Sequence, residues 1–279
     1  MLYAIKTSPQ CTTWEDMLAI WQAADRMPEF HSAWTFDHFY PINVPDTSGP
    51  CMEGWITLTA LAQATQRIRV GCMVTGTLYR HPAVLANMAA TLDIVSKGRL
   101  ELGLGAGWSE EECHAYGIDL GTLTQRFDRF EEACEVIHGL LVNETTDFNG
   151  KLYTLRNARC NPPPVQRPHP PICIGGNGEK RTFPLVARWA QHWNYAGYDL
   201  EGFVAKRTVL HRICREQGRD PSDLMTSIHQ PVDTANLATL EENCRRFRDE
   251  GLGLMIFYLA PPHSAEVLKP LAEIAARVG

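Results

Sequence analysis

Apolar positions follow two different periods along the chain. Short apolar runs, typical of buried strands, are each followed by a longer segment whose apolar residues recur every three or four positions, as on one face of a helix. In the helix predicted over residues 14–26, Met17, Leu18, Trp21 and Ala24 form one such stripe. The predicted strands cover residues 2–7, 32–36, 68–75, 99–104, 172–174, 192–196, 224–229 and 254–259.

Eight strands that alternate with helices favour a (β/α)8 TIM barrel, with a doubly wound sheet as the alternative. We expect a single domain over residues 1–279, with a small insertion at about residues 143–171, before the fifth strand. In this insertion, residues 147–155 are typical of a hairpin around Asn149-Gly150. The predicted helices cover residues 14–26, 53–63, 82–96, 123–142, 179–188, 200–217 and 237–250, with a short helix from 109 and a last one ending at 278.

The composition limits the classes of partner. The chain has 279 residues, 44% of them hydrophobic, and a formal net charge of −6, without a cluster of Lys and Arg among aromatics. We therefore expect no nucleic-acid partner. No stretch approaches the roughly 18 apolar residues of a membrane span, and the first residues are too polar for a signal peptide. These features predict a cytoplasmic protein that does not bind a membrane.

Cysteines and histidines show no metal-ligand spacing. The nine cysteines stand singly, without a C-x-x-C pair, and the ten histidines form no H-x-H or H-E-x-x-H motif. We expect free, mostly buried thiols and no metal site.

The run KGRLELGLGAGW, residues 97–108, combines a helix end, a buried strand and a glycine-rich loop. Gly103, Gly105 and Gly107 remove every second side chain where the strand passes into the loop, which would let a flat or phosphorylated ligand lie on the backbone. A dinucleotide fingerprint fails, because the third glycine would have to stand where Trp108 or Glu110 does. The alternative is a tight turn without a ligand.

Asp37 and His38 directly follow the second strand, and barrel enzymes place catalytic groups at that end. Histidine suits proton transfer near neutral pH, and an adjacent carboxylate could orient its ring. Adjacent side chains at a strand end point to opposite faces, so the two need not touch. The alternative is a histidine with a purely structural hydrogen bond.

Two other strand ends are rich in small residues. Residues 71–77 would leave a floor for a planar ring, although Thr75 could simply cap a turn. Residues 175–178, Gly-Gly-Asn-Gly, precede a helix, and backbone N–H groups in such a loop bind anions. Lys180 or Arg181 could add positive charge.

A different interpretation applies to the helix predicted over residues 123–142. Arg126 and Arg129 lie among acidic residues there, as on a solvated helix face.

At this point several motifs together resemble a known family. TSPQ-x-x-TWEDM, SAWTFDHF, the run from HPAVLANMAA through KGRLELGLGAGWSEEECHAYG, QRFDRFEE, and PICIGGNG followed by HWN are similar to the luciferase-like monooxygenase superfamily. The closer resemblance is to its coenzyme F420-dependent oxidoreductases. It covers most of residues 1–200, is most specific around 81–132, and is weak beyond 200.

The resemblance implies a barrel that holds coenzyme F420 or FMN at the carboxyl ends of its strands, in a homodimer. It implies that Asp37 and His38 lie beside the redox-active edge of the ring. It places a bulge with a non-prolyl cis peptide behind the ring at Cys72-Met73, within one residue of register. The other residues that it implies in cofactor binding, together with Thr75 and Asn177 of the same loops, are Ala106, Gly107, Gly175, Gly176 and Gly178.

The leading functional hypothesis is an F420-dependent oxidoreductase that moves a hydride between the deazaflavin and a small organic substrate, with His38 as proton donor or acceptor. An FMN-dependent monooxygenase is the close alternative. A flavin-binding protein without turnover and a metal-dependent barrel hydrolase are weaker ones.

Overall fold

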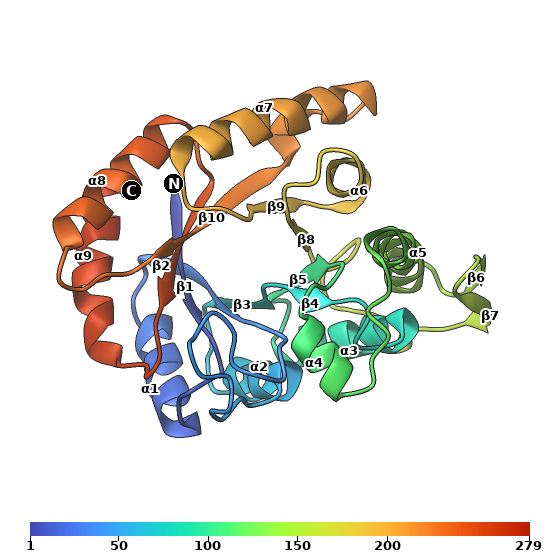
Figure 1. Ribbon diagram of the computed structural model, residues 1–279, viewed down its shortest axis with the longest axis horizontal. Helices are drawn as coiled ribbons and strands as arrows, with labels where there is room; N and C mark the ends of the chain where they lie inside the picture. The colour runs from blue at the N-terminus through green and yellow to red at the C-terminus, as the bar shows by residue number, and fades with distance from the viewer.

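The computed structural model describes residues 1–279 and shows a closed parallel barrel surrounded by helices (Figure 1). The first strand pairs with the last, and β3 also pairs with β5, so the ring has no free edge. Closure confirms the predicted TIM barrel and excludes the doubly wound sheet. In ring order the strands are β3 (Arg69–Cys72), β2 (Phe30–Thr35), β1 (Leu2–Thr7), β11 (Leu254–Leu259), β10 (Met225–Pro231), β9 (His192–Tyr195), β8 (Ile172–Gly175), β5 (Leu100–Gly105) and β4 (Thr75–Gly76).

The predicted third strand is interrupted. β3 ends at Cys72, β4 begins at Thr75, and a non-prolyl cis peptide joins Met73 and Val74 between them. This bond lies one residue after the predicted Cys72-Met73 position, within the one residue of register that the prediction allowed. β3 and β4 both pair with β5, so together they occupy one position in the barrel.

The helices surround the barrel (Figure 1). Their buried apolar residues pack with those of the strands in one core. Thr13 caps the first helix, accepting a hydrogen bond from the Asp16 N–H, and Pro82 starts another, where its missing N–H costs nothing. No helix is both long and apolar enough to span a membrane. The α-helices are α1 (Trp14–Asp25), α2 (Gly54–Gln63), α3 (Pro82–Val95), α4 (Glu110–Ala115), α5 (Leu123–Val142), α6 (Thr182–Trp189), α7 (Leu200–Glu216), α8 (Leu237–Asp249) and α9 (Leu268–Val278), and the short 3-10 helices are η1 (Pro221–Asp223) and η2 (Ala265–Val267).

Side chains fill the middle of the barrel interior. Trp34 is fully buried there among Ala4, Leu254 and Ile256. A Cβ at Gly71 would lie 2.4 Å from the Trp34 ring, so glycine makes room for the indole. The barrel is therefore packed at this level, and a ligand can enter only above it.

Between α5 and β8 the chain leaves the barrel pattern, as predicted. β6 (Thr146–Asn149) and β7 (Thr154–Ala158) form an antiparallel pair apart from the main sheet. The Glu132 carboxylate accepts N–H hydrogen bonds from residues 151–153 and ties their connection to α5. All nine cysteines are free, and all but Cys11 and Cys51 are buried.

Candidate functional site

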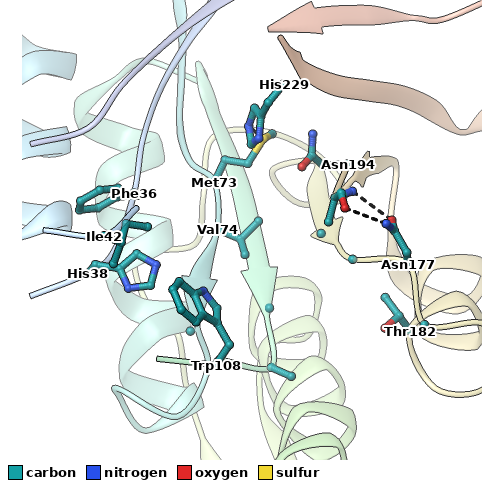
Figure 2. Close-up of a pocket in the computed structure, with 18 of the residues that line it drawn as sticks. Phe36, His38, Ile42, Met73, Val74, Trp108, Asn177, Thr182, Asn194 and His229 are labelled. Carbon is teal, nitrogen blue, oxygen red and sulfur yellow. Dashed lines mark hydrogen bonds between the residues drawn. The ribbon is translucent and has the colours of Figure 1, made fainter. Parts of the chain in front are cut away.

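A cavity of about 600 Å³ opens at the carboxyl ends of the strands. Its walls come from the loops after most of the strands and from α5 and α6. Figure 2 shows Asn177 and Thr182 on one side of Val74, and Phe36, Ile42 and His38 on the other. None of the lining residues is an aspartate or a glutamate, whereas Lys6 and Arg126 are among them. The cavity is large enough for a cofactor-sized ligand and lacks negative charge.

His38 lines this cavity and is 8% exposed. Its Nδ1 lies 2.6 Å from Oε1 of Glu112, at the start of α4, and the ring makes edge contacts with Phe36 and Trp108 at centroid distances of 5.1 and 5.3 Å. Because the carboxylate engages Nδ1, Nε2 is the ring nitrogen available to a ligand.

Glu112 is fully buried and was not singled out from the sequence. Besides His38, it accepts hydrogen bonds from the Tyr79 hydroxyl and, at 2.8 Å, from the Phe39 N–H. Burial raises the pKa of Glu112, but these hydrogen bonds outweigh burial and leave its pKa below the usual value. In the sequence, Glu112 is the last of three consecutive glutamates in a first helical turn, and nothing local shows which of them faces inward.

Asp37 does not line the cavity, contrary to the prediction. It is 1% exposed and holds Arg80 through contacts of 2.6 and 2.9 Å, and Arg80 also pairs with Glu53, the N-cap of α2. Burial lowers the pKa of Arg80, but the two carboxylates outweigh it and raise the pKa. Neighbouring side chains at a strand end point apart, so His38 faces the cavity while Asp37 anchors the loop.

The bulge between β3 and β4 contributes Met73 and Val74 to the cavity, but not Cys72 or Thr75. Cys72 packs in the core outside the barrel, and the Thr75 hydroxyl accepts a hydrogen bond from the Trp55 indole at 2.8 Å. The prediction that Cys72 and Thr75 lie in the site is therefore wrong. Met73 and Val74 thus face the cavity, whereas Cys72 and Thr75 face away from it.

The glycines of β5 make room for the bulge between β3 and β4, and one of them also lines the cavity. A Cβ at Gly103 would lie 1.9 Å from the Cys72 carbonyl oxygen, so this glycine is needed for strand packing and not for a ligand. Gly105 lines the cavity and also makes room for Val74, since a Cβ there would lie 2.6 Å from a Val74 methyl. Ala106 and Gly107, which the resemblance assigns to cofactor binding, line the cavity, and Gly107 has a φ of +83°.

Arg126 also lines the cavity, so its interpretation as a solvated helix residue is wrong. Its guanidinium donates a hydrogen bond to the Gly107 carbonyl oxygen at 3.2 Å, and its buried Nε has no partner. Arg129, by contrast, pairs with the exposed Asp119. Periodicity identified the helix, but it did not show that the Arg126 side chain reaches the loop after β5.

Residues 175–178, which the resemblance assigns to cofactor binding, all line the cavity. Hydrogen bonds of 2.9 and 3.0 Å join the Asn177 amide to the Ala196 backbone after β9 (Figure 2). The backbone N–H groups of residues 177–180 donate no hydrogen bond within the chain. Arg181 pairs with Asp128 and Glu131 outside the cavity, and Lys180 is exposed, so neither adds charge to this loop.

The inner end of the cavity contains residues that the sequence did not indicate. Lys6 of β1 donates a hydrogen bond to the Met73 carbonyl oxygen at 3.0 Å, and Nε2 of His229 lies 3.0 Å from the Met73 sulfur. Burial, with Lys6 and His192 nearby, lowers the pKa of His229 well below its usual value. This shift favours the neutral imidazole, so the positive charge at this end of the cavity comes from Lys6.

Comparison with known proteins assigns the family. Residues 3–277 match the model of the luciferase-like monooxygenases. The chain belongs to this family. The resemblance predicted from the sequence motifs is thereby confirmed, and the match extends through the last third of the chain.

Two curated relatives match parts of the chain. An uncharacterised protein of Mycobacterium tuberculosis is 32% identical over 169 residues, which are 61% of this chain and 58% of that protein. The F420-dependent glucose-6-phosphate dehydrogenase of Amycolatopsis mediterranei is 31% identical over 174 residues, 62% of this chain and 48% of that enzyme. The matches thus span about half the length of these relatives.

Solved structures share the whole fold. An F420-dependent secondary alcohol dehydrogenase in complex with an F420-acetone adduct superposes with a TM-score of 0.85 at 18% identity, covering 100% of this chain and 99% of that one. A monooxygenase from Streptomyces bottropensis superposes with a TM-score of 0.76 at 19% identity, covering 100% and 97%. At these identities the similarity shows the fold alone.

Proposed function

We propose that the protein is an F420-dependent oxidoreductase that transfers a hydride between the deazaflavin and a small organic substrate. One observation carries the proposal: the cavity joins a glycine loop with free N–H groups at one side to a histidine oriented by a buried carboxylate at the other. The 31% identity to an F420-dependent glucose-6-phosphate dehydrogenase supports this cofactor.

The residues of the cavity fit a phosphate-bearing cofactor. The free N–H groups of residues 177–180 suit a phosphate, and the absent side chains of Gly175 and Gly176 let it approach the backbone. Thr182 and the unpaired Nε of Arg126 offer further donors. Val74, Met73 and Ala106 provide apolar surface for a planar ring. When bound, the cofactor supplies the hydride-transfer chemistry.

In this reaction the side chains of the protein hold the ligands and transfer one proton. With Glu112 on Nδ1, Nε2 of His38 is the atom that exchanges this proton. As the carbon of an alcohol gives up a hydride, its hydroxyl proton passes to Nε2, and in the reverse direction Nε2 returns it to the carbonyl oxygen. The carboxylate of Glu112 stabilises the ring while it carries the extra proton. Asp37 has no part in this step, because it is buried on Arg80.

An FMN-dependent monooxygenase is the second candidate, favoured by the structural similarity to the Streptomyces monooxygenase. The same loop would take the FMN phosphate. Fluorescence titration with both cofactors separates the two functions. Tighter binding of F420 supports the proposal, whereas tighter binding of FMN, or a protein that is yellow as purified, supports the monooxygenase.

A second experiment measures turnover of the bound cofactor. Alcohols, ketones and organic acids are screened for oxidation or reduction of bound F420, followed by its absorbance. Cofactor binding without turnover for any of them would favour a flavin-binding protein that is not an enzyme.

A further inference from the structure

The inner end of the cavity, formed by Lys6, His229 and Tyr258 beside Met73, is not used by the proton transfer on His38. These side chains come from β1, β10, β11 and the bulge, and all four line the cavity. Figure 2 shows His229 next to Met73, on the side of Val74 away from Trp108. This inner end is therefore a separate part of the same cavity.

Lys6 is a buried cation without a counter-ion. It is 9% exposed, its ammonium lies 5.2 Å from the centre of the Tyr258 ring, and its one hydrogen bond is to the Met73 carbonyl oxygen. No carboxylate pairs with it, and none lines the cavity. An ammonium has three N–H donors, so two remain for a ligand.

An uncompensated buried charge costs stability, and a bound anion would offset that cost. Two donors on one nitrogen match the oxygens of a carboxylate. A phosphate needs more donors, and the loop at residues 177–180 already provides them. A neutral carbonyl would leave the ammonium charge unbalanced after the cofactor had excluded water from the cavity.

We infer that Lys6 binds a carboxylate of the substrate, so that the protein acts on small organic acids. Phe36, Tyr258 and Met73 line the same cavity and offer apolar surface to the substrate body, while Lys6 holds its charged end. The inference rests on the proposed function, because it assigns the substrate class of that same cavity.

Calorimetric titration with benzoate and its neutral analogue benzamide tests this role. The protein is first saturated with F420, or with inorganic phosphate, so that the loop at residues 175–178 is occupied. Wild type should bind benzoate about 10- to 100-fold more tightly than benzamide, the range expected for hydrogen bonds to a charged group. Lys6→Met should bind both ligands equally.

Lys6→Gln and Lys269→Met provide the controls. Glutamine keeps an N–H donor for the Met73 carbonyl oxygen but has no charge, so it should also lose the preference. Lys269 is exposed on α9, and its replacement makes the same change in net charge without touching the cavity. Lys269→Met should keep the preference for benzoate.

Wild type alone offers a second measurement, which does not depend on how the variants fold. Burial lowers the pKa of Lys6 to about 8, whereas the facing groups titrate elsewhere: burial raises the pKa of Cys72 and Tyr258 and lowers that of His229. The benzoate preference should therefore decrease as the pH rises from about 7 to about 10 and Lys6 loses its proton.

Three outcomes would overturn the inference: no benzoate preference in wild type, a preference that persists in both Lys6 variants, or one that is constant over this pH range. If Lys6→Met weakens F420 binding more than tenfold and leaves benzoate binding unchanged, Lys6 serves the cofactor, and the proposed function still stands. If F420 does not bind but benzoate does so through Lys6, the proposed function fails and the acid site remains.

Discussion

The two ends of the barrel differ in whether every buried charge has a partner within the chain. At the amino end, Glu101 lies 2.8 Å from the guanidinium of Arg69 and 3.3 Å from His192. At the carboxyl end, Glu112 pairs with His38 and Asp37 with Arg80, but Lys6 and Arg126 line the cavity without a carboxylate partner. Paired charges complete the fold by themselves, whereas unpaired ones are satisfied only when a ligand arrives.

A chain of hydrogen bonds links the two ends. His192 contacts the Ser227 hydroxyl at 2.6 Å, and Asn194 donates to the same oxygen at 2.9 Å. Asn194 lines the cavity, so the paired network supports the cavity floor from below. Rigid support of this kind keeps a site in its working geometry.

The largest expected effect comes from removing the proton carrier at the cavity end. His38→Ala should lower turnover by about 10²- to 10⁴-fold, the usual contribution of a positioned acid or base. The dissociation constant of F420 should change by less than about tenfold, because loop and bulge hold the cofactor. Steady-state kinetics and fluorescence titration measure both, with His114→Ala on the exposed face of α4 as control. Unchanged turnover would remove His38 from the mechanism.

Breaking the charge pairs at the amino end of the barrel should lower the stability of the protein rather than its turnover. Glu101→Gln should lower the free energy of unfolding by about 3 kcal/mol, because it leaves the buried His192 and the partly exposed Arg69 without their carboxylate. Lys6→Met should not lower it, because the replacement removes a buried charge that has no counter-ion. Urea titration measures both, and the exposed pair of Glu135, tested as Glu135→Gln, should have almost no effect. An equal loss of unfolding free energy in Glu101→Gln and Lys6→Met would contradict the difference between the two ends of the barrel.

Glu101 should also make the stability of the folded protein depend on pH. Burial raises the pKa of Glu101, but His192 and Arg69 outweigh burial and hold it at about 2 in the folded chain, against about 4.3 when unfolded. Its stabilisation is complete above the unfolded value and is lost as the pH falls towards 2. The stability difference between wild type and Glu101→Gln should therefore shrink over this range, and a constant difference would argue against the ionised pair.

A carboxylate placed in the glycine loop tests the cofactor side of the cavity. Gly176→Asp should weaken F420 binding by at least about 100-fold, since the new charge would repel a phosphate bound by the N–H groups. Gly218→Asp is the matched control, because both glycines have positive φ, +120° and +75°, and Gly218 lies away from the cavity. Normal binding by Gly176→Asp would place the phosphate elsewhere.

The smallest expected effect concerns the positioning of His38. Glu112→Gln keeps an acceptor for Nδ1 but loses the charge, and kcat should fall by about tenfold with KM and F420 affinity unchanged. Glu110→Gln, in the same helical turn but exposed, should leave kcat unaltered. A similar decrease in both variants would assign the effect to α4 as a whole.

Periodicity and strand ends were enough to predict the barrel and several of the loops that line the cavity. Each strand prediction overlaps an observed strand, and the loops with His38, Gly107 and Gly175 to Gly178 do line the cavity. These are local properties, because the end of a strand in a barrel defines which face of the molecule a residue occupies. The family motifs added the cofactor hypothesis and the bulge near Met73.

The amino-acid sequence by itself therefore determined the order of strands and helices, the barrel and which loops surround the cavity. Only the tertiary structure decided that Asp37 turns away onto Arg80, that Glu112 reaches His38, and that Arg126 lacks a carboxylate partner. The physical reason is that pairing of side chains depends on distances between segments far apart in the chain: 74 positions separate His38 from Glu112. Such distances exist only after the barrel has closed.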